Sequence, residues 1–485
     1  MLFFPLADGA NNFCAGKKTA LDWSGLLSLA FMIPYSASLP YLADTAACYA
    51  AISDLPWAAW LDSAGLGRYD ILCAQPVVTL VTRGAETEIT DADGTQSSND
   101  DPFGLIRQRL GETVPSMPGI PFSGGAAGYW GYDLARRMMP FPVLAQDAGR
   151  LPDMAIGIYD WAVVFDHRQK TAQLVSQQRY AETKILLPEI LERLRHAGKL
   201  PADTFNVQGS VTSNFTPDSY ASAFAQVQKY LRAGDCYQVN LAQCFSATVS
   251  GDAMGAYLTL RSLSPAPYSA FLNLPQARIL CASPERFLRV QNGKVETKPI
   301  KGTRPRSNDA RQDNRLAEEL RNHPKDRAEN LMIVDLLRSD LGKSCIPGSV
   351  RVPELFDVES FANVHHLVST VEGKLAEGRD ALHVLRDCFP GGSVTGAPKQ
   401  RAMQIIGRLE PHPRGIYCGA IGYVGFDGNM DSNIVIRTLV CSGNKIHCWA
   451  GGGIVADSDM AAEYQETLDK AAGMLKLLQQ YGGNL

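Results

Sequence analysis

The sequence lacks the features that mark several common classes of protein. No apolar run reaches the roughly 18–20 residues of a membrane-spanning helix. No long basic run occurs and the formal net charge is −4, which argues against nucleic acid or an acidic membrane surface as the main partner. The eleven cysteines include no C-x-x-C pair, which argues against a zinc site or a disulfide framework and favours a reducing, cytoplasmic compartment.

The residues that are present fit a large globular protein. The 485 residues are enough for roughly two to three domains or for one large intertwined body. Hydrophobic residues make up 45% and charged residues 20%, so the chain can bury a sizeable core. Near the start, KKTALDWSGLLSLAFMIPYSAS loosely resembles a secretory signal, but its apolar stretch is short and Asp22 interrupts the approach to it. We therefore predict that residues 1–31 are a disordered extension.

Strand and helix patterns are interspersed along the rest of the chain. IGIYDWAVVFD (156–166) predicts one buried strand. The polar, turn-rich LPADTFNVQGSVTSN marks a boundary between an N-terminal region, 32–205, and a C-terminal region, 206–485. Because the spacing is not the regular alternation of a doubly wound sheet, the pattern favours an α+β fold.

Two helices have clear boundary signals. Thr216 as N-cap and Pro217 at the first helical position begin a helix that closes at Gly234. A final helix is predicted from about Asp459 to Gln480.

Two helical stretches place carboxylates beside apolar stripes. In DRAENLMIVDLL, Glu329 shares a face with several apolar residues, and Asp326 lies one turn earlier. In AEYQETLDK, Glu463 and Glu466 share a face. A buried carboxylate must be paired, protonated or bound to a metal. An arginine ion pair for the first stretch and a solvated acidic face for the second remain alternatives, but two carboxylate pairs together suit Mg²⁺.

Two glycine-rich stretches are predicted to be turns that lead into helices. FPGGSVTGAPK offers Ser393 and Thr395 ahead of a helix that contains Lys399. WAGGGIVADS offers Gly451, Gly452 and Gly453 ahead of the final helix. Free N–H groups in such turns bind carboxylates or phosphates, although both stretches also fit tight structural turns.

A positively charged residue interrupts an apolar pattern between these stretches. NIVIRTLV predicts a strand that contains Arg437, whose guanidinium needs a carboxylate partner from the protein or from a substrate. His365 and His366 cannot both line one pocket, because adjacent strand residues face opposite ways. Together with the glycine-rich turns and the carboxylates, Arg437 indicates a small substrate with more than one carboxylate.

The order of the motifs resembles that of the chorismate-utilising enzymes, a family that includes anthranilate, isochorismate and salicylate synthases. The motifs are SPERF (283–287), PIKGTRPR, DRAENLMIVDLLRSDLG, VHHLVS, FPGGSVTGAPK, IRTL, GGGIVADS and EYQET. LPWAAWLDS, GGAAGYWGYDLARR and LPDMAIGIYDWAVVFDH extend the resemblance into the N-terminal region. The resemblance implies two antiparallel β-sheets packed face to face and covered by helices, with the N- and C-terminal halves interleaved.

Two positions indicate which reaction of the family is implied. Members that add water carry a lysine base at the position of Gln238, and a neutral amide cannot deprotonate water. Anthranilate synthases typically carry a small residue at the position of Lys301, whereas P-I-K-G-T is typical of members that aminate chorismate at C4. The resemblance thus implies that Lys301 attacks C2, that Glu285 protonates the departing C4 hydroxyl and that His366 assists.

The resemblance also implies a product, a metal, a set of substrate contacts and a partner. The product is 4-amino-4-deoxychorismate, for para-aminobenzoate and folate biosynthesis, and a separate glutaminase subunit supplies the ammonia. Mg²⁺ is held by Glu329 and Glu466, with Glu463 and Asp326 direct or through water. The expected substrate contacts are Arg437, Lys399, Gly451, Gly452, Gly453, Ser393, Thr395 and Gln238.

An aromatic amino acid pocket, which holds tryptophan in some members, is implied in the N-terminal half. The matching residues are Ser63, Arg68, Tyr69, Pro267, Tyr268 and Ser269. The loop between Ser63 and Arg68 is shorter than the family pattern, so tryptophan binding stays open. Two alternatives to C4 amination also stay open: anthranilate synthesis, and a non-catalytic subunit that binds tryptophan or docks a glutaminase.

Overall fold

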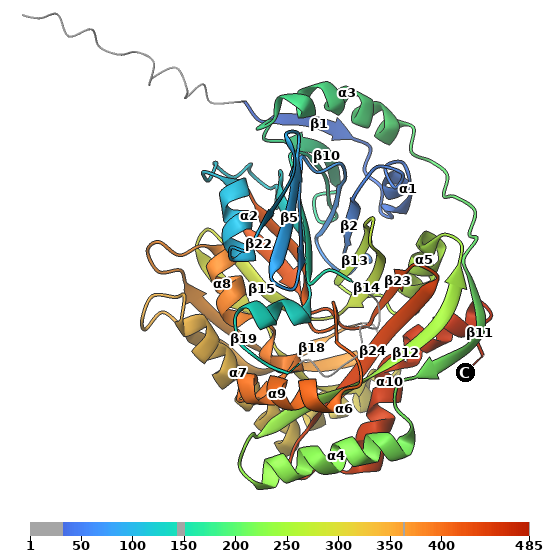
Figure 1. The fold of residues 1–485 in the computed structure, drawn as a ribbon, viewed down its shortest axis with the longest axis vertical. Coiled ribbons are helices and arrows are strands. Elements are labelled where there is room, and N and C mark those ends of the chain that lie inside the picture. The colour runs from blue at the N-terminus through green and yellow to red at the C-terminus, as the bar shows by residue number, and fades with distance from the viewer. Residues whose placement is uncertain (1–32, 143–150, 362–363, 485) are drawn as a thin grey trace, which may run out of the picture. The chain divides into compact units, whose positions relative to one another are not determined.

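The computed structural model describes residues 33–142, 151–361 and 364–484, and Pro34–Leu485 forms one compact unit. The predicted extension, residues 1–31, lies outside the described residues. Two twelve-stranded sheets carry this unit, and helices lie against them (Figure 1). No helix in the described part of the chain is long and apolar enough to cross a membrane.

The first sheet pairs its strands antiparallel throughout. In the order in which they pair, its strands are β1 (Tyr35–Leu39), β10 (Thr171–Ser176), β9 (Ala162–Asp166), β3 (Tyr69–Cys73), β2 (Ala58–Asp62), β13 (Tyr268–Asn273), β14 (Arg278–Ser283), β23 (Thr438–Ser442), β24 (Lys445–Ile454), β12 (Gln238–Ser250) and β11 (Asn206–Ser213), with β20 (Gly396–Ala397) against β12.

The second sheet is also antiparallel. Its strands, again in pairing order, are β17 (Ile300–Pro305), β19 (Val364–Lys374), β16 (Lys294–Thr297), β15 (Arg286–Gln291), β22 (Met430–Asn433), β21 (Ala420–Gly425), β7 (Gly125–Trp130), β8 (Met154–Tyr159), β4 (Val78–Arg83), β5 (Glu86–Asp91) and β6 (Gly94–Ser98), with β18 (Arg351–Ser360) against β19.

Each sheet combines five strands of the N-terminal region with seven strands of the C-terminal region. In the first sheet the two halves meet where β2 pairs with β13, Trp60 opposite Phe271. In the second they meet where β21 pairs with β7, Ile421 opposite Tyr129. The predicted α+β fold with two antiparallel sheets and interleaved halves is therefore confirmed. The division at residues 205 and 206 stays a prediction.

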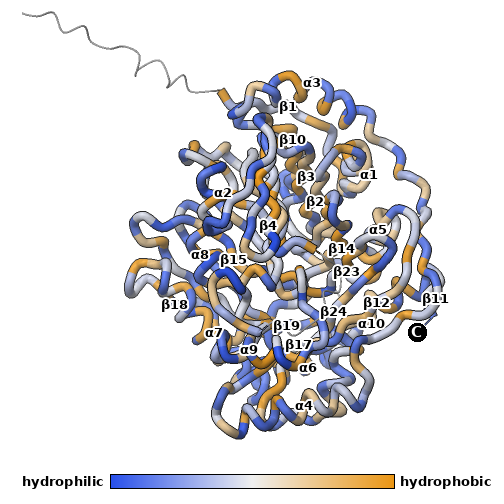
Figure 2. Tube along the Cα trace, in the orientation of Figure 1, coloured by the Kyte–Doolittle hydropathy of each residue, from blue (hydrophilic) through white to orange (hydrophobic). Residues whose placement is uncertain are grey.

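The helices lie in the connections between strands and pack against the two sheets (Figure 1). They are α1 (Ala46–Ala50), α2 (Pro102–Leu110), α3 (Ala181–Arg195), α4 (Pro217–Arg232), α5 (Ala253–Leu263), α6 (Ala310–Asn322), α7 (Pro324–Gly342), α8 (Ala381–Cys388), α9 (Lys399–Leu409) and α10 (Met460–Gln480), with the 3-10 helices η2 (Tyr132–Arg137) and η3 (Gly392–Val394). Thr216 caps α4 as predicted, because its hydroxyl accepts the N–H of Ser219. Hydrophilic and hydrophobic residues alternate along α3, which buries only one face (Figure 2).

Two hydrophobic clusters occupy the two faces of the first sheet. On β3, Ile71 and Cys73 belong to the cluster shared with the second sheet, whereas Leu72 belongs to the cluster under α5 and α10. This alternation follows from the two-residue period of a strand. All ten cysteines in the described ranges are buried and free, in agreement with the absence of a disulfide framework.

The single strand predicted over residues 156–166 is two strands in different sheets. β8 belongs to the second sheet and β9 to the first, and the chain crosses between them at Asp160 and Trp161. The Asp160 carboxylate accepts the backbone N–H groups of Arg179 at 3.0 Å and Tyr180 at 2.9 Å, which stabilises the crossing. In the sequence, Asp160 is the one charged residue inside this otherwise apolar stretch, and it marks the place of the break.

Candidate active site

Three segments from different parts of the chain bring Lys301, Glu285 and Ser393 together. Lys301 lies on β17, Glu285 lies between β14 and β15, and Ser393 lies in η3. Lys301 Nζ donates to the carbonyl oxygen of Ser393 at 2.9 Å, and Ser393 Oγ donates to Glu285 Oε1 at 2.7 Å. Ser393 therefore links the predicted nucleophile to the predicted acid.

Two glycines let the η3 loop approach its neighbours. A Cβ on Gly391 or on Gly392 would lie 2.4 Å from an isoleucine or a leucine side chain, which is too close for any larger residue. Thr395 is fully buried and its hydroxyl donates to Gly391 O at 3.1 Å, which closes the turn. The predicted contact of Thr395 with substrate is not supported, because its hydroxyl is used inside the loop.

The surroundings of Lys301 favour a neutral amine. Burial lowers the pKa of Lys301; the carboxylate of Glu285 opposes this, and the ammonium of Lys470 on α10 adds to it. Glu329 and Glu466 also act to raise this pKa, so both lie near Lys301. Within the described ranges, no carboxylate oxygen lies within ion-pair distance of Lys301 Nζ.

Glu285 is held rigidly in a buried position. Its side chain is buried, and its carbonyl oxygen accepts the N–H of Ile434 at 3.0 Å. Burial raises the pKa of Glu285, although Lys301 and the hydroxyl of Ser393 oppose the shift. A carboxyl group in this setting tends to hold its proton, as a general acid requires.

Three carboxylates on α7 and α10 face one another. Burial raises the pKa of Glu329 and also that of Glu463, and in each case the charge of Glu466 adds to the shift. Ser458 Oγ donates to Glu463 Oε1 at 2.6 Å, whereas Glu463 Oε2 is buried without a hydrogen-bond partner in the described structure. Because an unpaired buried carboxylate oxygen is costly, this atom fits a ligand for a cation.

No three histidine, cysteine, aspartate or glutamate side chains in the described ranges converge closely enough to hold a metal ion. Lys470 Nζ lies 2.5 Å from Glu466 Oε1 and donates to Gly451 O at 3.0 Å. The carboxylate of Glu466 is thus paired with a lysine one turn later on α10. The donor set is nevertheless oxygen-only, which is the kind that Mg²⁺ takes, and the free oxygen of Glu463 is consistent with a metal.

Asp326 has other partners. Its Oδ2 lies 3.2 Å from Arg304 Nη2 and 3.0 Å from His323 Nδ1. A Cβ on Gly302 would lie 2.9 Å from Asp326 Cγ, so β17 packs closely against this carboxylate. Asp326 therefore packs at the start of α7 against β17. Its Oδ2 is near Arg304 but is buried without a hydrogen-bond partner in the described structure, so its role as a metal ligand stays a prediction.

The glycines 451–453 lie inside β24 and not in a turn before a helix, so that part of the prediction was wrong. A Cβ on Gly452 would lie 2.8 Å from Glu463 Oε2, and one on Gly453 would lie 1.9 Å from Gln238 Nε2. The glycines are therefore required for close approach: they let α10 and the Gln238 side chain pack directly on the strand.

Gln238 begins β12 and is buried beside Gly453. Its side-chain oxygen has no hydrogen-bond partner in the described part of the chain. An amide held in this way can bind a polar group but cannot act as a base.

Arg437 does not lie in a strand, contrary to the prediction. It lies between β22 and β23 with a φ of 53°, and its guanidinium donates to Lys470 O at 2.7 Å. Burial lowers the pKa of Arg437. No carboxylate of the described residues lies within ion-pair distance of it, so the guanidinium can accept a substrate carboxylate.

His365 and His366 have different partners, as their adjacent positions predict. His365 Nε2 lies 3.0 Å from Asp313 Oδ1, whereas His366 Nδ1 lies 2.9 Å from Thr303 Oγ1. Burial, with a contribution from Arg437, lowers the pKa of His366 to about 4. The imidazole of His366 is therefore neutral at neutral pH.

Lys399 is not part of this cluster. Its side chain is buried, and Nζ donates to Asp340 Oδ2 at 2.6 Å and to Cys388 O at 2.5 Å. The predicted contact with a substrate carboxylate is not supported, because the ammonium is paired inside the protein.

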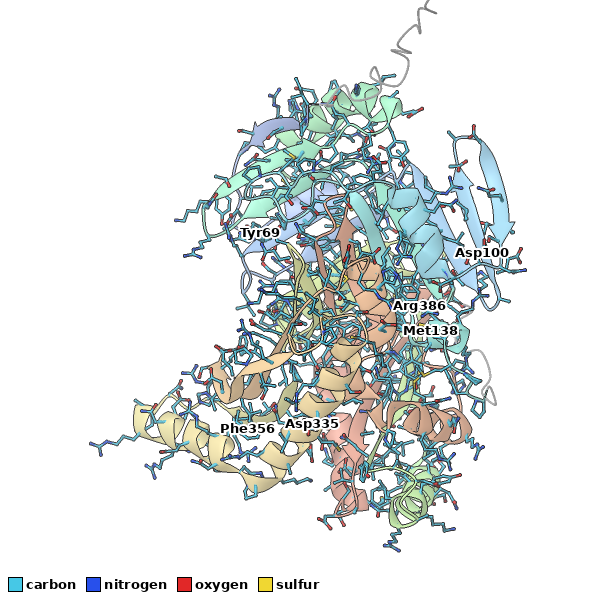
Figure 3. All side chains as sticks on the ribbon, turned by 90° about the vertical axis from the view of Figure 1, so that its left-hand side faces the viewer. Tyr69, Asp100, Met138, Asp335, Phe356 and Arg386 are labelled. Carbon is cyan, nitrogen blue, oxygen red and sulfur yellow. The ribbon has the colours of Figure 1, made fainter. Side chains whose placement is uncertain are left out.

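A separate cavity of about 750 Å³ is lined by residues of both sheets. Five of the six residues predicted for an amino acid pocket line it: Arg68, Tyr69 (labelled in Figure 3), Pro267, Tyr268 and Ser269. Ser63 is the exception, because its N–H and Oγ both donate to Asp70 Oδ1, at 2.8 and 2.7 Å.

Sequence reasoning missed two cationic residues of this region. Lys470 follows the last predicted metal ligand by four positions, which is the spacing of a helical ion pair and a usable signal. Arg414 is fully buried and donates to Val394 O and Asn240 O, both at 2.9 Å, and to Glu410 at 2.7 Å. It fixes the η3 loop to β12, and its four-residue spacing from Glu410 is the same kind of signal.

Comparisons with known proteins agree with this arrangement. Residues 58–476 match the family described as chorismate binding enzyme. The chain is 47% identical over 456 residues to aminodeoxychorismate synthase component 1 of Escherichia coli K12, covering 92% of this chain and 99% of that one. It is 39% identical over 437 residues to anthranilate synthase component 1 of Streptomyces coelicolor, covering 86% and 82%.

Solved structures show the same fold. Anthranilate synthase component I from Streptococcus pneumoniae superposes with a TM-score of 0.75 at 33% identity, over 84% of this chain and 92% of that one. The menaquinone-specific isochorismate synthase from Escherichia coli superposes with a TM-score of 0.68 at 20% identity, over 94% and 98%. The second likeness bears on the fold alone.

Proposed function

The chain belongs to the chorismate-binding enzymes, as its ordered motifs predicted, and from that premise we propose that it converts chorismate and ammonia into 4-amino-4-deoxychorismate. The observation that carries the proposal is the half-buried Lys301 amine, which has no carboxylate partner among the described residues and lies beside the buried Glu285. The relative with 47% identity is named for the same product.

The first step forms a bond between Lys301 Nζ and C2 of chorismate. The two ring double bonds shift, the C4–O bond breaks, and Glu285 gives its proton to the departing hydroxyl, which leaves as water. A neutral amine is the reactive form, which agrees with the lowered pKa of Lys301. His366, neutral at neutral pH, can hydrogen-bond the departing oxygen.

The second step reverses the displacement with ammonia. Ammonia forms a bond with C4, the double bonds shift back, and the bond between C2 and Lys301 breaks to release the neutral amine. The ammonium formed at C4 returns one proton to Glu285. Both residues thus end the cycle in the forms in which they began it.

Substrate binding is assigned to polar groups whose hydrogen-bonding or charge requirements the described residues leave partly unmet. Arg437 would take one carboxylate of chorismate, and the Gln238 amide would contact the ring substituents. Glu329, Glu463 and Glu466 would hold Mg²⁺, which would bind and polarise the ring carboxylate. Because Gln238 is an amide, activation of water at C2 is disfavoured.

Two partners complete the proposal. A separate glutaminase would supply ammonia, in line with the words "component 1" in the names of the relatives. The cavity of about 750 Å³ would bind an aromatic amino acid such as tryptophan, since Tyr69 and Tyr268 line it and Arg68 lies at its wall. A cytoplasmic location and a role in para-aminobenzoate synthesis for folate are part of the same proposal.

The test is an incubation of the purified protein with chorismate, Mg²⁺ and ammonia, with products identified by mass. We expect 4-amino-4-deoxychorismate with the enolpyruvyl group retained, and in Lys301→Ala a loss of activity on the order of 10³-fold or more. Anthranilate with pyruvate would overturn the proposal and favour the reaction of the 39% identical relative. A fully active Lys301→Ala would overturn the covalent step.

A further inference from the structure

We propose that Ser393 is a positioning residue that keeps the Lys301 amine and the Glu285 acid apart and aims the acid at the substrate. This rests on the proposed function, since it concerns the same two groups. The geometry is unusual in that one residue binds both: its carbonyl oxygen accepts from Lys301 Nζ at 2.9 Å and its hydroxyl donates to Glu285 Oε1 at 2.7 Å.

Separation matters because the two groups would otherwise disable each other. A direct contact would let the Glu285 carboxyl proton pass to the Lys301 amine, which gives a carboxylate and an ammonium. That ion pair is stable in a buried setting, but its lysine is no nucleophile and its glutamate is no acid. With Ser393 between them, Lys301 meets a carbonyl oxygen, which cannot give it a proton.

The hydroxyl of Ser393 also selects an oxygen of Glu285. A protonated carboxyl group accepts a hydrogen bond best on its proton-free oxygen. Because Ser393 donates to Oε1, the proton of Glu285 is directed to Oε2, the oxygen that Ser393 leaves free. The carboxyl group is thus oriented before the substrate arrives.

The position of Ser393 is fixed from several sides. Arg414 Nη1 donates to Val394 O at 2.9 Å, directly after Ser393 in the chain. Thr395 Oγ1 donates back to Gly391 O at 3.1 Å. Ser393 itself is buried, 8% exposed, so it cannot turn out to solvent without moving the loop.

Four charged residues face Lys301 from three segments of the chain, and only Glu285 among them is hydrogen-bonded to Ser393. They are Glu285 between β14 and β15, Glu329 on α7, and Glu466 and Lys470 on α10. A change at Ser393 should therefore act on Lys301 through Glu285, while the other three charges stay in place.

The experiment measures the reactivity of the Lys301 amine in the full chain without chorismate. Cyanate carbamoylates neutral amines, and peptide mass spectrometry gives the modified fraction of Lys301 at each pH. In Ser393→Ala we expect the Glu285 side chain to reach Lys301 and to stabilise its ammonium form. The half-modification pH, at which half of Lys301 is carbamoylated, should then rise by about one unit, and the modified fraction at a fixed lower pH should fall about tenfold. Ser393→Thr, which keeps the hydroxyl, should behave as the unmodified chain.

A double-mutant comparison separates this role from a merely structural one. In a Glu285→Gln background, Ser393→Ala should leave the half-modification pH unchanged, because an amide has no proton to give. An equal shift with and without Glu285 would overturn the proposal, and so would an unshifted Ser393→Ala.

A matched control and a second variant keep the test decisive. Ser344 is also buried and donates to a carboxylate, Asp387 Oδ2 at 2.5 Å, outside the cluster, so Ser344→Ala should leave Lys301 reactivity unchanged. If Ser393→Ala does not fold, Ser393→Cys replaces it, because a thiol has similar volume but is a weak donor. The carbamoylation experiment contains no chorismate, so its result does not depend on the product of the ammonia assay. A product other than 4-amino-4-deoxychorismate in that assay would overturn the proposed function but not the conclusion about Ser393.

Discussion

Two lysines of this protein, the half-buried Lys301 and the buried Lys399, have opposite surroundings. Lys399 has Asp340 Oδ2 at 2.6 Å and Cys388 O at 2.5 Å, so its charge is paired. Among the described residues, Lys301 Nζ donates to the carbonyl oxygen of Ser393 at 2.9 Å and has no carboxylate within ion-pair distance, and burial lowers the pKa of Lys301. Lys399 stabilises the fold through its ion pair. Lys301 forms no such pair with the described residues, so its amine is available to react with a substrate.

The same contrast holds for the two arginines of the region. Arg414 is surrounded by acceptors, among them Glu410 at 2.7 Å. Arg437 has one backbone carbonyl and no carboxylate within ion-pair distance in the described structure. Burial of a charge without its partner is costly, so a cluster of such charges marks the place where a ligand completes the pairing.

The largest effect is expected from removing the proton of Glu285. Glu285→Gln should lower the rate of amination by about 10²–10⁴-fold, because an amide cannot act as general acid. The unmodified enzyme needs Glu285 protonated and Lys301 neutral, so its rate should fall at both low and high pH. The residual rate of Glu285→Gln should rise with pH as Lys301 loses its proton, and then stay level. A remaining fall at high pH in this variant would contradict the assignment of the acid.

The next effect concerns stability and separates the two lysines. Lys399→Ala removes the buried partner of Asp340 Oδ2 and leaves this carboxylate with Lys343, whose Nζ donates to Oδ1 at 2.9 Å, so the free energy of unfolding should fall by about 3 kcal/mol. Lys301→Ala removes an amine that has no carboxylate partner and should leave stability nearly unchanged. Urea denaturation of both variants measures this directly. Equal losses in the two would remove the distinction between a paired and an unpaired lysine.

The smallest effect is expected at Gly452. A Cβ there would lie 2.8 Å from Glu463 Oε2, so Gly452→Ala should displace that carboxylate and weaken Mg²⁺ binding roughly tenfold, with little change in stability. Titration calorimetry with Mg²⁺ alone gives the affinity. Gly342→Ala is the matched control, since a Cβ at Gly342 meets no atom within 4 Å. Unchanged Mg²⁺ affinity in Gly452→Ala would argue against Glu463 as a ligand.

Local patterns predicted the elements whose signals lie within a few residues. The cap at Thr216 and the final helix were placed to within a residue or so, because capping and periodicity act locally. The crossing at Asp160 was missed because its hydrogen-bond partners, Arg179 and Tyr180, lie some twenty positions away in the chain.

The sequence predicted many of the residues of the site, but it did not predict which of them contact one another. We predicted a turn at glycines 451–453 because glycine favours turns. In the structure they lie in the strand β24, where the absence of a side chain lets α10 pack closely on the strand. The two roles of Ser393 depend on β17 and on the segment before β15, and neither is near it in the sequence. Such long-range packing leaves no local sign.

The central claim, that Lys301 forms a bond to the substrate, has one direct test. The purified protein is incubated with chorismate and Mg²⁺ without ammonia, then digested, and the peptide that contains Lys301 is weighed. We expect this peptide to gain the mass of chorismate less one water, and the corresponding peptide of Lys301→Ala to gain nothing. An unmodified Lys301 peptide, from a preparation that forms product once ammonia is added, would contradict it.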